Sequence, residues 1–212
     1  MLQIRWHGHS CFEITDKQTI ITDPHDGKSI GIPTPVIHGD IILISHDHYD
    51  HNSVKTVEKD QSKIITEPRK RTIGETIIRG FVTFHDEYGG AKRGENIMYN
   101  CIINGMSFLH AGDLGHILDE KTIDAIGPVD ILFIPIGGTY TLDAQGAWEV
   151  ILKLKPKITI PMHYKIEGLS LPIAPLDDFL DVAKYPVIKV GNEIDIEKEE
   201  LPNEPEIWVF TL

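Results

Sequence analysis

The sequence predicts an α/β fold in which helices cover two β-sheets, and three observations lead to this prediction. Short runs rich in β-branched residues alternate with helix-like segments along the 212-residue chain. The run at 41–44 is apolar at every position, which is typical of a strand covered on both faces. The segment after Asp143 carries apolar residues at helical spacing. These residues are Ala144, Ala147, Trp148, Ile151 and Leu152.

The first half of the chain is predicted to consist mostly of strands. The runs with strand character are residues 3–6, 11–14, 19–22, 41–44, 63–66, 76–79, 81–84, 97–103 and 107–109. Asn104-Gly105 separates the last two runs and is a strong signal for a tight hairpin. Asn52 or Ser53 is suited to cap a helix that continues to about Lys59.

The second half is predicted to alternate between helices and strands. We expect helices at 119–126, from Asp143 to the break at Pro156, and at 175–183. Strands are expected at 129–134 and 157–160, and the β-rich residues 206–212 can pair within a sheet or with a second copy of the chain. No repeat or linker divides the sequence, so we expect one domain over residues 1–212.

Composition narrows the function classes. The formal net charge is −12, which argues against a nucleic-acid coat or an anionic membrane as partner. No apolar run approaches the roughly 20 residues of a membrane-spanning helix. Two cysteines are too few for a disulfide framework, and no signal peptide is visible, so we expect a cytoplasmic protein. Histidine is abundant, with 11 residues that are unevenly spread.

Three of these histidines follow the 41–44 strand directly. His46, His48 and His51 share a six-residue stretch with the carboxylates Asp47 and Asp50. Imidazole and carboxylate together suit zinc, manganese or iron(II). In an extended segment, residues two apart point the same way, so His46 and His48 can converge on one ion. The chain must then bend, which turns Asp50 and His51 toward another point. The spacing therefore favours two adjacent ions over one.

This segment resembles the metal-binding signature of the metallo-β-lactamase superfamily. Further landmarks of that superfamily follow in order along the chain. They are Ile21-Thr22-Asp23-Pro24, His46-x-His48-x-Asp50-His51, Phe84-His85-Asp86, His110-Ala111-Gly112-Asp113 and Pro161-Met162-His163-Tyr164. The resemblance implies a metallo-β-lactamase-like αββα sandwich of two mixed β-sheets flanked by helices.

The resemblance also implies a role for each residue. His46, His48 and His85 would hold a first ion, Asp50, His51 and His163 a second, and Asp113 would bridge both. Asp23 and His9 would support these ligands from behind. A hydroxide between the two ions would attack the substrate, with Asp50 orienting it. His116, Tyr140 and a metal-bound water are the alternatives for the proton donor to the leaving group. Zinc or manganese is expected, with iron or nickel left open.

The opening Trp6-His7-Gly8-His9-Ser10 resembles a bacterial and archaeal branch of small hydrolases that includes proteins similar to L-ascorbate-6-phosphate lactonase. This resemblance implies hydrolysis of an ester, lactone or phosphoester of a small, anionic metabolite. Two alternatives stay open. One is a phosphodiesterase or nuclease that acts on nucleic acid, and the other is a metal-binding sensor or scaffold without turnover.

Two loops are candidates for binding the substrate. Lys92 and Arg93 lie in a glycine-flanked segment that can act as a lid over a phosphate or carboxylate, or be an exposed turn. Gly138, Thr139 and Tyr140 precede the Asp143 helix, where backbone N–H groups can form an anion nest. His25, in a loop rich in Pro and Gly, is expected to be solvated.

Overall fold

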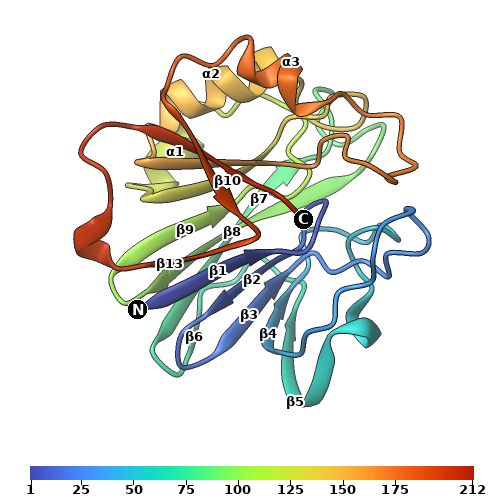
Figure 1. Ribbon diagram of the computed structural model, residues 1–212, viewed down its shortest axis with the longest axis vertical. Coiled ribbons are helices and arrows are strands. Elements are labelled where there is room, and N and C mark those ends of the chain that lie inside the picture. The colour runs from blue at the N-terminus through green and yellow to red at the C-terminus, as the bar shows by residue number, and fades with distance from the viewer.

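The computed structural model describes residues 1–212 as two mixed β-sheets packed face to face, with three α-helices on the outer face of one sheet (Figure 1). The first sheet has six strands in the order β13-β1-β2-β3-β4-β5. Their bounds are β1 Leu2–Trp6, β2 Phe12–Thr15, β3 Thr19–Thr22, β4 Gly39–Leu43, β5 Glu58–Ile65 and β13 Glu193–Ile196. β3, β4 and β5 are parallel neighbours, whereas the other pairings are antiparallel.

The second sheet has eight strands in the order β12-β14-β11-β10-β9-β8-β7-β6. Their bounds are β6 Arg71–Ile73, β7 Thr76–Phe84, β8 Glu95–Ile103, β9 Met106–His110, β10 Ile131–Pro135, β11 Ile158–Met162, β12 Val187–Gly191 and β14 Glu206–Phe210. β14 pairs with β11 and β12, so the β-rich end of the chain joins its own sheet. The fold class expected from the sequence is confirmed.

The environment of strand β4 explains why residues 41–44 are all apolar. Ile41 and Leu43 point into the main core of 44 buried residues between the sheets. Ile42 and Ile44 point to the outer face and join a smaller cluster with Ile21 of β3. Both faces of this strand are therefore buried, as the sequence predicted, because side chains alternate between the two faces of a sheet.

The helix predicted from Ser53 to about Lys59 is wrong. The chain forms only a 3₁₀ turn at Val54–Thr56, and Ser53 makes no capping hydrogen bond through its side chain. Val57 is buried in the outer cluster beside Ile42, and its carbonyl oxygen accepts the N–H of Gly39. Packing of this β-branched residue takes the chain straight into β5, so a loop and a short turn cover the outer face of the first sheet.

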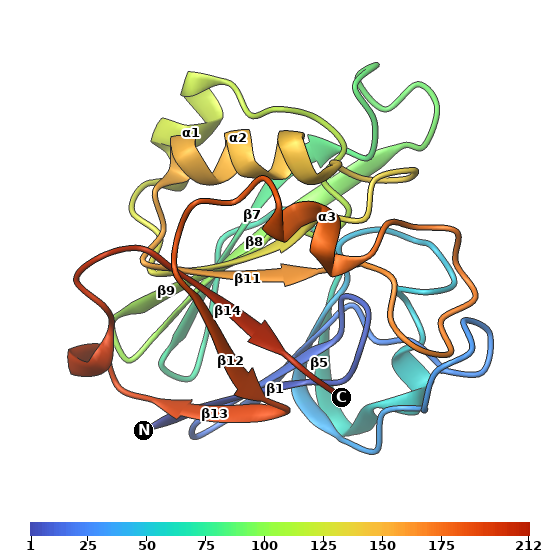
Figure 2. The same cartoon turned by 45° about the horizontal axis from the view of Figure 1, so that its top comes forward.

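The other helices lie where the sequence predicted them, over the eight-stranded sheet (Figure 2). They are α1 Glu120–Ile126, α2 Ala144–Leu154 and the short α3 Leu176–Leu180, and a 3₁₀ turn spans Lys198–Glu200. Asp119 and Asp143 cap α1 and α2 by accepting N–H groups of the first turn. The Asn104-Gly105 hairpin is confirmed, with φ of 50° and 73°. No helix has both the length and the apolar character to cross a bilayer.

The strand directions gather the chemically interesting residues at one edge. β3 and β4 are parallel, so Asp23 and His46 follow strands that end together. In the other sheet β9, β10 and β11 are parallel, and β7 runs the same way because β8 is antiparallel to both β7 and β9. His85, Asp113 and His163 therefore follow strands that also end together. Ligands of α/β proteins commonly bind beyond the carboxyl ends of strands.

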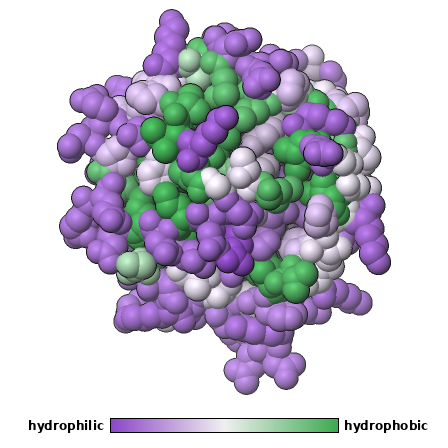
Figure 3. Space-filling view, viewed as in Figure 1, coloured by the Kyte–Doolittle hydropathy of each residue, from purple (hydrophilic) through white to green (hydrophobic).

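The surface agrees with the composition. Hydrophilic side chains cover much of the face seen in Figure 3, and apolar residues form separate patches between them. The large apolar side chains are mostly inside, where 86 of the 212 residues are buried.

The cap of α2 gives a test of local stability. Asp143→Ala removes the oxygen that accepts the N–H of Gly146 at 2.8 Å, and we expect a loss of about 1 kcal/mol in the free energy of unfolding. Asp143→Asn keeps an acceptor and should restore most of this loss. Urea unfolding of the two variants checks the prediction, which would be wrong if both were equally stable.

Candidate metal centre

Two groups of histidine and carboxylate side chains meet at the edge just described. His46, His48 and His85 form the first group, in which the candidate ligand atoms lie within 4.8 Å of one another. The second group meets the same criterion and comprises His9, Asp50, His51 and His163. The structure therefore brings together side chains from four separate segments of the chain that the sequence singled out.

Asp113 lies between the two groups. Its Oδ2 is 3.1 Å from Nε2 of His85 and 3.6 Å from Nε2 of His46, in the first group. The same oxygen is 3.3 Å from Nε2 of both His51 and His163, in the second group. One carboxylate thus contacts both clusters, which is the position that a bridging ligand needs.

Several polar atoms of this centre are buried without a hydrogen-bond partner. They are Nε2 of His46, His51 and His163, Nδ1 of His9 and His163, and Oδ1 of Asp113. A buried polar atom without a partner costs about 1–3 kcal/mol, so a cluster of them indicates a missing ligand. Nitrogen and oxygen donors without thiolate suit zinc, manganese, iron or nickel. The residues therefore fit divalent metal ions.

Asp23 orients two of the histidines from behind. Its Oδ2 is 3.1 Å from Nδ1 of His51 and accepts the hydroxyl proton of Ser45 at 2.7 Å. Because the hydroxyl of Ser45 donates to Asp23, the Ser45 oxygen accepts a hydrogen bond from Nδ1–H of His46, with 2.8 Å between the two atoms. Both imidazoles are thereby held with Nδ1 protonated and Nε2 turned toward Asp113. Such support fixes the tautomer and orientation of metal ligands.

His85 is held in the same way by a backbone group. Its Nδ1 donates to the carbonyl oxygen of Tyr140 at 2.8 Å, which leaves Nε2 facing Asp113. His163 differs, because neither ring nitrogen has a partner and its φ is 53°. A non-glycine residue in this left-handed region is strained, and such strain commonly marks functional sites.

Asn96 shapes the loop that carries Asp113, a role that sequence reasoning missed because the only signal was a polar residue within a strand. Its Oδ1 accepts the N–H of Asp113 at 2.9 Å, and its Nδ2 donates to the carbonyl oxygen of Ala111 at 2.9 Å. Gly112, which lies between Ala111 and Asp113 in the chain, has a φ of 57°, and a Cβ there would collide with Asn96 and Ser45. Ser45 is the second supporting residue that sequence reasoning missed.

The carboxylates of the centre and His46 carry the charges that metal binding needs. Burial raises the pKa of Asp113, but the neighbouring His163 and His51 lower it well below its usual value. Burial likewise raises the pKa of Asp50, and hydrogen bonds from His51 and His9 outweigh it, so this carboxylate is also ionised. Burial lowers the pKa of His46 to about 3, which keeps its imidazole neutral. For His51 and His85, burial also lowers the pKa, but the carboxylate of Asp113 outweighs it and raises both values, so these imidazoles release a proton when they bind a metal. Ionised carboxylates and neutral imidazoles are the forms that ligate metals.

His9 lies closer to the centre than its expected supporting role requires. Its Nε2 is 3.1 Å from Oδ2 of Asp50, and its ring centroid is 4.1 Å from that of His163. Burial and the nearby His163 lower the pKa of His9 to about 3. A neutral His9 that donates to Asp50 orients this carboxylate, so we keep it as a proposed positioning residue.

The structure gives His116 and His25 environments that the sequence did not predict. Nε2 of His116 accepts the backbone N–H of Phe84 at 3.2 Å, and Nδ1 donates to the carbonyl oxygen of Ile117 at 3.0 Å. With both nitrogens engaged by the backbone, His116 is not free to donate a proton to a leaving group. His25 is fully buried rather than solvated, because its loop folds back and Nε2 donates to the carbonyl oxygen of His7.

A cavity of about 250 Å³ opens onto the centre. Its wall contains His48, Tyr49, Asp50, His85, Arg93, Asp113, Tyr140, His163 and Leu171. The guanidinium of Arg93 stacks over the ring of Tyr140 at 4.6 Å and donates to the carbonyl oxygen of Thr139 at 3.2 Å. Lys92 does not line this cavity but an adjacent one. Of the candidate substrate residues, Arg93 and Tyr140 therefore line the cavity at the centre.

Part of the anion nest expected at Gly138 is taken up by the loop itself. The N–H of Gly138 donates to the carbonyl oxygen of Leu142, and the carbonyl oxygen of Gly138 accepts the N–H groups of Tyr140 and Thr141. These three N–H groups are therefore not available to a ligand.

The support by Asp23 can be tested apart from catalysis. Asp23→Asn keeps one acceptor oxygen but places an NH₂ group where Ser45 and His51 now donate. We expect the affinity for zinc to fall about 10–100-fold, which is the usual effect of losing such a partner. Competition with a chromogenic chelator measures this affinity, and Asp177→Asn on the exposed face of α3 is the control. A folded Asp23→Asn protein with unchanged affinity would contradict the assignment.

Comparison with known proteins supports the same interpretation. A family model described as a β-lactamase superfamily domain matches residues 3–163. A UPF0173 metal-dependent hydrolase of Thermoplasma acidophilum is 33% identical over 186 residues, covering 77% of this chain and 83% of that protein. A crystal structure of a proposed zinc-dependent hydrolase of the metallo-β-lactamase superfamily from Thermotoga maritima has 34% identity and a TM-score of 0.81, covering 99% of this chain and 98% of that one. An isothiocyanate hydrolase from Delia radicum gut bacteria shares the fold at 12% identity, with a TM-score of 0.65 over 85% of this chain and 91% of that one. The chain therefore belongs to the metallo-β-lactamase superfamily, among relatives of the UPF0173 metal-dependent hydrolases.

Proposed function

We propose that this protein is a binuclear metal-dependent hydrolase that cleaves an ester, lactone or phosphoester of a small anionic molecule. The observation that carries the proposal is the position of Asp113 between two histidine groups, in which Nε2 of His46, His51 and His163 has no hydrogen-bond partner. The names of the relatives, which describe metal-dependent hydrolases, point the same way. The narrower likeness to the lactonase branch stays a prediction.

The two groups would divide the ions between them. His46, His48 and His85 would hold one ion, Asp50, His51 and His163 the other, and Asp113 would contact both. Two bound divalent ions, zinc or manganese foremost, would lower the pKa of a shared water and neutralise charge on the attacked group. This ligand set leaves open coordination positions, which distinguish catalytic from structural metal sites.

The protein's own residues would prepare the reaction. Asp50 lines the cavity as an ionised carboxylate held by His9, so it can orient the attacking water. Tyr140 lies in the same wall, and its backbone carbonyl fixes His85. Because His116 is engaged by the backbone, Tyr140 is the side chain that we propose as proton donor to the leaving group.

The size of the cavity and the position of Arg93 support a small anionic substrate. A volume of about 250 Å³ lies just below the roughly 300–1,000 Å³ of most ligand sites in proteins. Arg93 is the single lysine or arginine among its lining residues, which also include the carboxylates of Asp50 and Asp113. Its guanidinium is oriented by Thr139 and Tyr140 rather than by a carboxylate. A guanidinium held in this way suits a carboxylate or phosphate on the substrate.

The bridging position gives the main test of the proposal. Asp113→Ala should remove most of the bound metal and nearly all turnover, because both ions lose a shared charged ligand. Elemental analysis of the purified protein measures the metal and identifies it. Metal-dependent hydrolysis of nitrophenyl esters and phosphodiesters measures turnover. A variant that keeps both its metal and its activity would refute the proposed centre.

The same assays separate the alternative functions. Activity on generic esters that a chelator abolishes supports the hydrolase. Metal binding with no turnover on any ester or phosphodiester would favour a sensor or scaffold, and cleavage of single-stranded RNA or DNA would favour a nuclease.

Arg93 gives a test of substrate charge. Arg93→Gln should raise KM for a nitrophenyl ester with an acyl carboxylate about fivefold, the scale of an exposed charge pair. The rise should be larger than the rise for the uncharged ester of similar size. Equal changes in KM for the two esters would show that the guanidinium does not recognise charge.

A further inference from the structure

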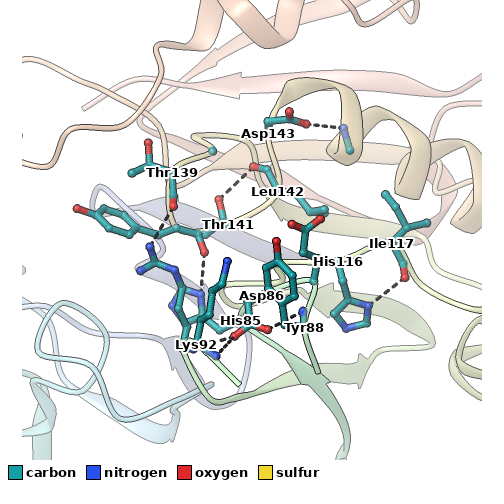
Figure 4. Close-up of a pocket in the computed structure, with 16 residues that line it drawn as sticks. His85, Asp86, Tyr88, Lys92, His116, Ile117, Thr139, Thr141, Leu142 and Asp143 are labelled. Atoms are coloured by element: carbon teal, nitrogen blue, oxygen red, sulfur yellow. Dashed lines mark hydrogen bonds between the residues drawn. The ribbon is translucent and has the colours of Figure 1, made fainter. Parts of the chain in front are cut away.

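A second, larger cavity lies beside the centre. It has a volume of about 490 Å³ and shares His85, Arg93 and Tyr140 with the central cavity (Figure 4). We call it the outer cavity. Its remaining wall comes from the loop 86–93, from residues 115–117, from the loop 138–142 and from the first turn of α2 with its cap. The stacked pair of Arg93 and Tyr140 therefore borders both cavities.

The loop 86–93 is built around one carboxylate. Oδ1 of Asp86 accepts the N–H groups of Tyr88 and Gly90, and Oδ2 accepts those of Lys92 and Arg93, at 2.7–3.0 Å. With four donors, the oxygens of Asp86 face the loop backbone. This arrangement fixes the backbone positions from which the side chains of Lys92 and Arg93 extend.

Two further carboxylates line the outer cavity. Oδ1 of Asp143 accepts the N–H of Gly146 at 2.8 Å, as the dashed line in Figure 4 shows. Glu87 is exposed and makes no hydrogen bond or ion pair. Of the three acidic residues in the wall, Glu87 alone therefore has a carboxylate without a donor.

The cations of the outer cavity also lack ionic partners. Nζ of Lys92 lies 3.6 Å from the centre of the Tyr88 ring, and neither Lys92 nor Arg93 forms an ion pair. In a chain with 32 acidic residues and 20 basic ones, a cation has many carboxylates available. Two neighbouring cations held by aromatic rings, beside the proposed metal centre, are therefore arranged for an anion from outside.

We propose that the outer cavity binds an oxyanion, a carboxylate or a phosphate, on the arm of the substrate remote from the bond that is cleaved. That the anion belongs to a substrate rests on the proposed hydrolase function, whereas anion binding itself does not require turnover. Lys92 determines the affinity for this remote anion, and Glu87 opposes it. The substrate class is thus an ester or lactone whose charged group is separated from the reacting carbonyl by a spacer.

Anion binding is tested first on the full chain treated with a chelator, so that no metal can hold the probe. Phenyl phosphate and phenylacetate are titrated separately, and backbone amide shifts are followed by NMR. The shifts should concentrate in residues 86–93 and 115–117. Lys92→Gln should weaken binding about fivefold and Glu87→Gln should tighten it, as expected for exposed charges. Lys121→Gln, on α1 outside both cavities, is the control that should change nothing.

Binding by both probes would assign an oxyanion site without preference, and binding by one would identify its chemistry. The proposal is overturned if neither probe binds, if the shifts lie elsewhere, or if the Lys92 and Glu87 variants bind as the parent does.

The link to turnover is tested on the metal-loaded protein. The 4-nitrophenyl monoesters of succinic, glutaric and adipic acid are compared with uncharged esters of equal length. We expect kcat/KM to favour the charged ester at the longer spacers, and Lys92→Gln should reduce this preference. If uncharged esters are hydrolysed but charge gives no advantage at any length, the outer cavity has no role in substrate choice. If no ester is hydrolysed, the proposed function fails, and the binding experiment still decides whether the anion site exists.

Discussion

A single buried carboxylate determines how the functional edge of this protein is organised. Asp113 is 2% exposed, and an ionised group at that depth needs compensating donors or cations. The fold supplies four histidines around its Oδ2, and each belongs to a loop that follows a strand of one or the other sheet. The same carboxylate thus contacts loops from both sheets. Removal of the carboxylate would therefore disturb packing and chemistry together.

The supporting residues extend this organisation into the core. Asp23 connects the end of β3 to Ser45 and His51, and Asn96 connects β8 to the loop of Asp113. Each hydrogen bond selects a tautomer or fixes a backbone N–H, so the protein itself orients the ligand atoms. Preorganisation of this kind lowers the cost of binding an ion.

Much of this could be predicted from the sequence, because local patterns carried it. The run 41–44, the Asn104-Gly105 hairpin and the Asp143 cap each follow from side-chain alternation, backbone preference or a single hydrogen bond. The histidine cluster was visible because its members lie within six residues. The failures concern contacts between distant segments. The helix predicted after Ser53 does not form because Val57 is buried in the outer cluster. The ring nitrogens of His116 form hydrogen bonds with backbone groups of Phe84 and Ile117, which no local pattern reveals.

The backbone N–H donors around Asp86 hold the conformation of the loop 86–93, which borders both cavities, largely independently of its other side chains. Since backbone groups hold the turn, the side chains at 87, 88, 91 and 92 can be exchanged without unravelling it. Relatives could thus diverge in the molecules they accept while the histidine centre stays untouched. Evolution would then tune selectivity at one small, self-supporting segment, much as antibodies vary loops on a constant framework.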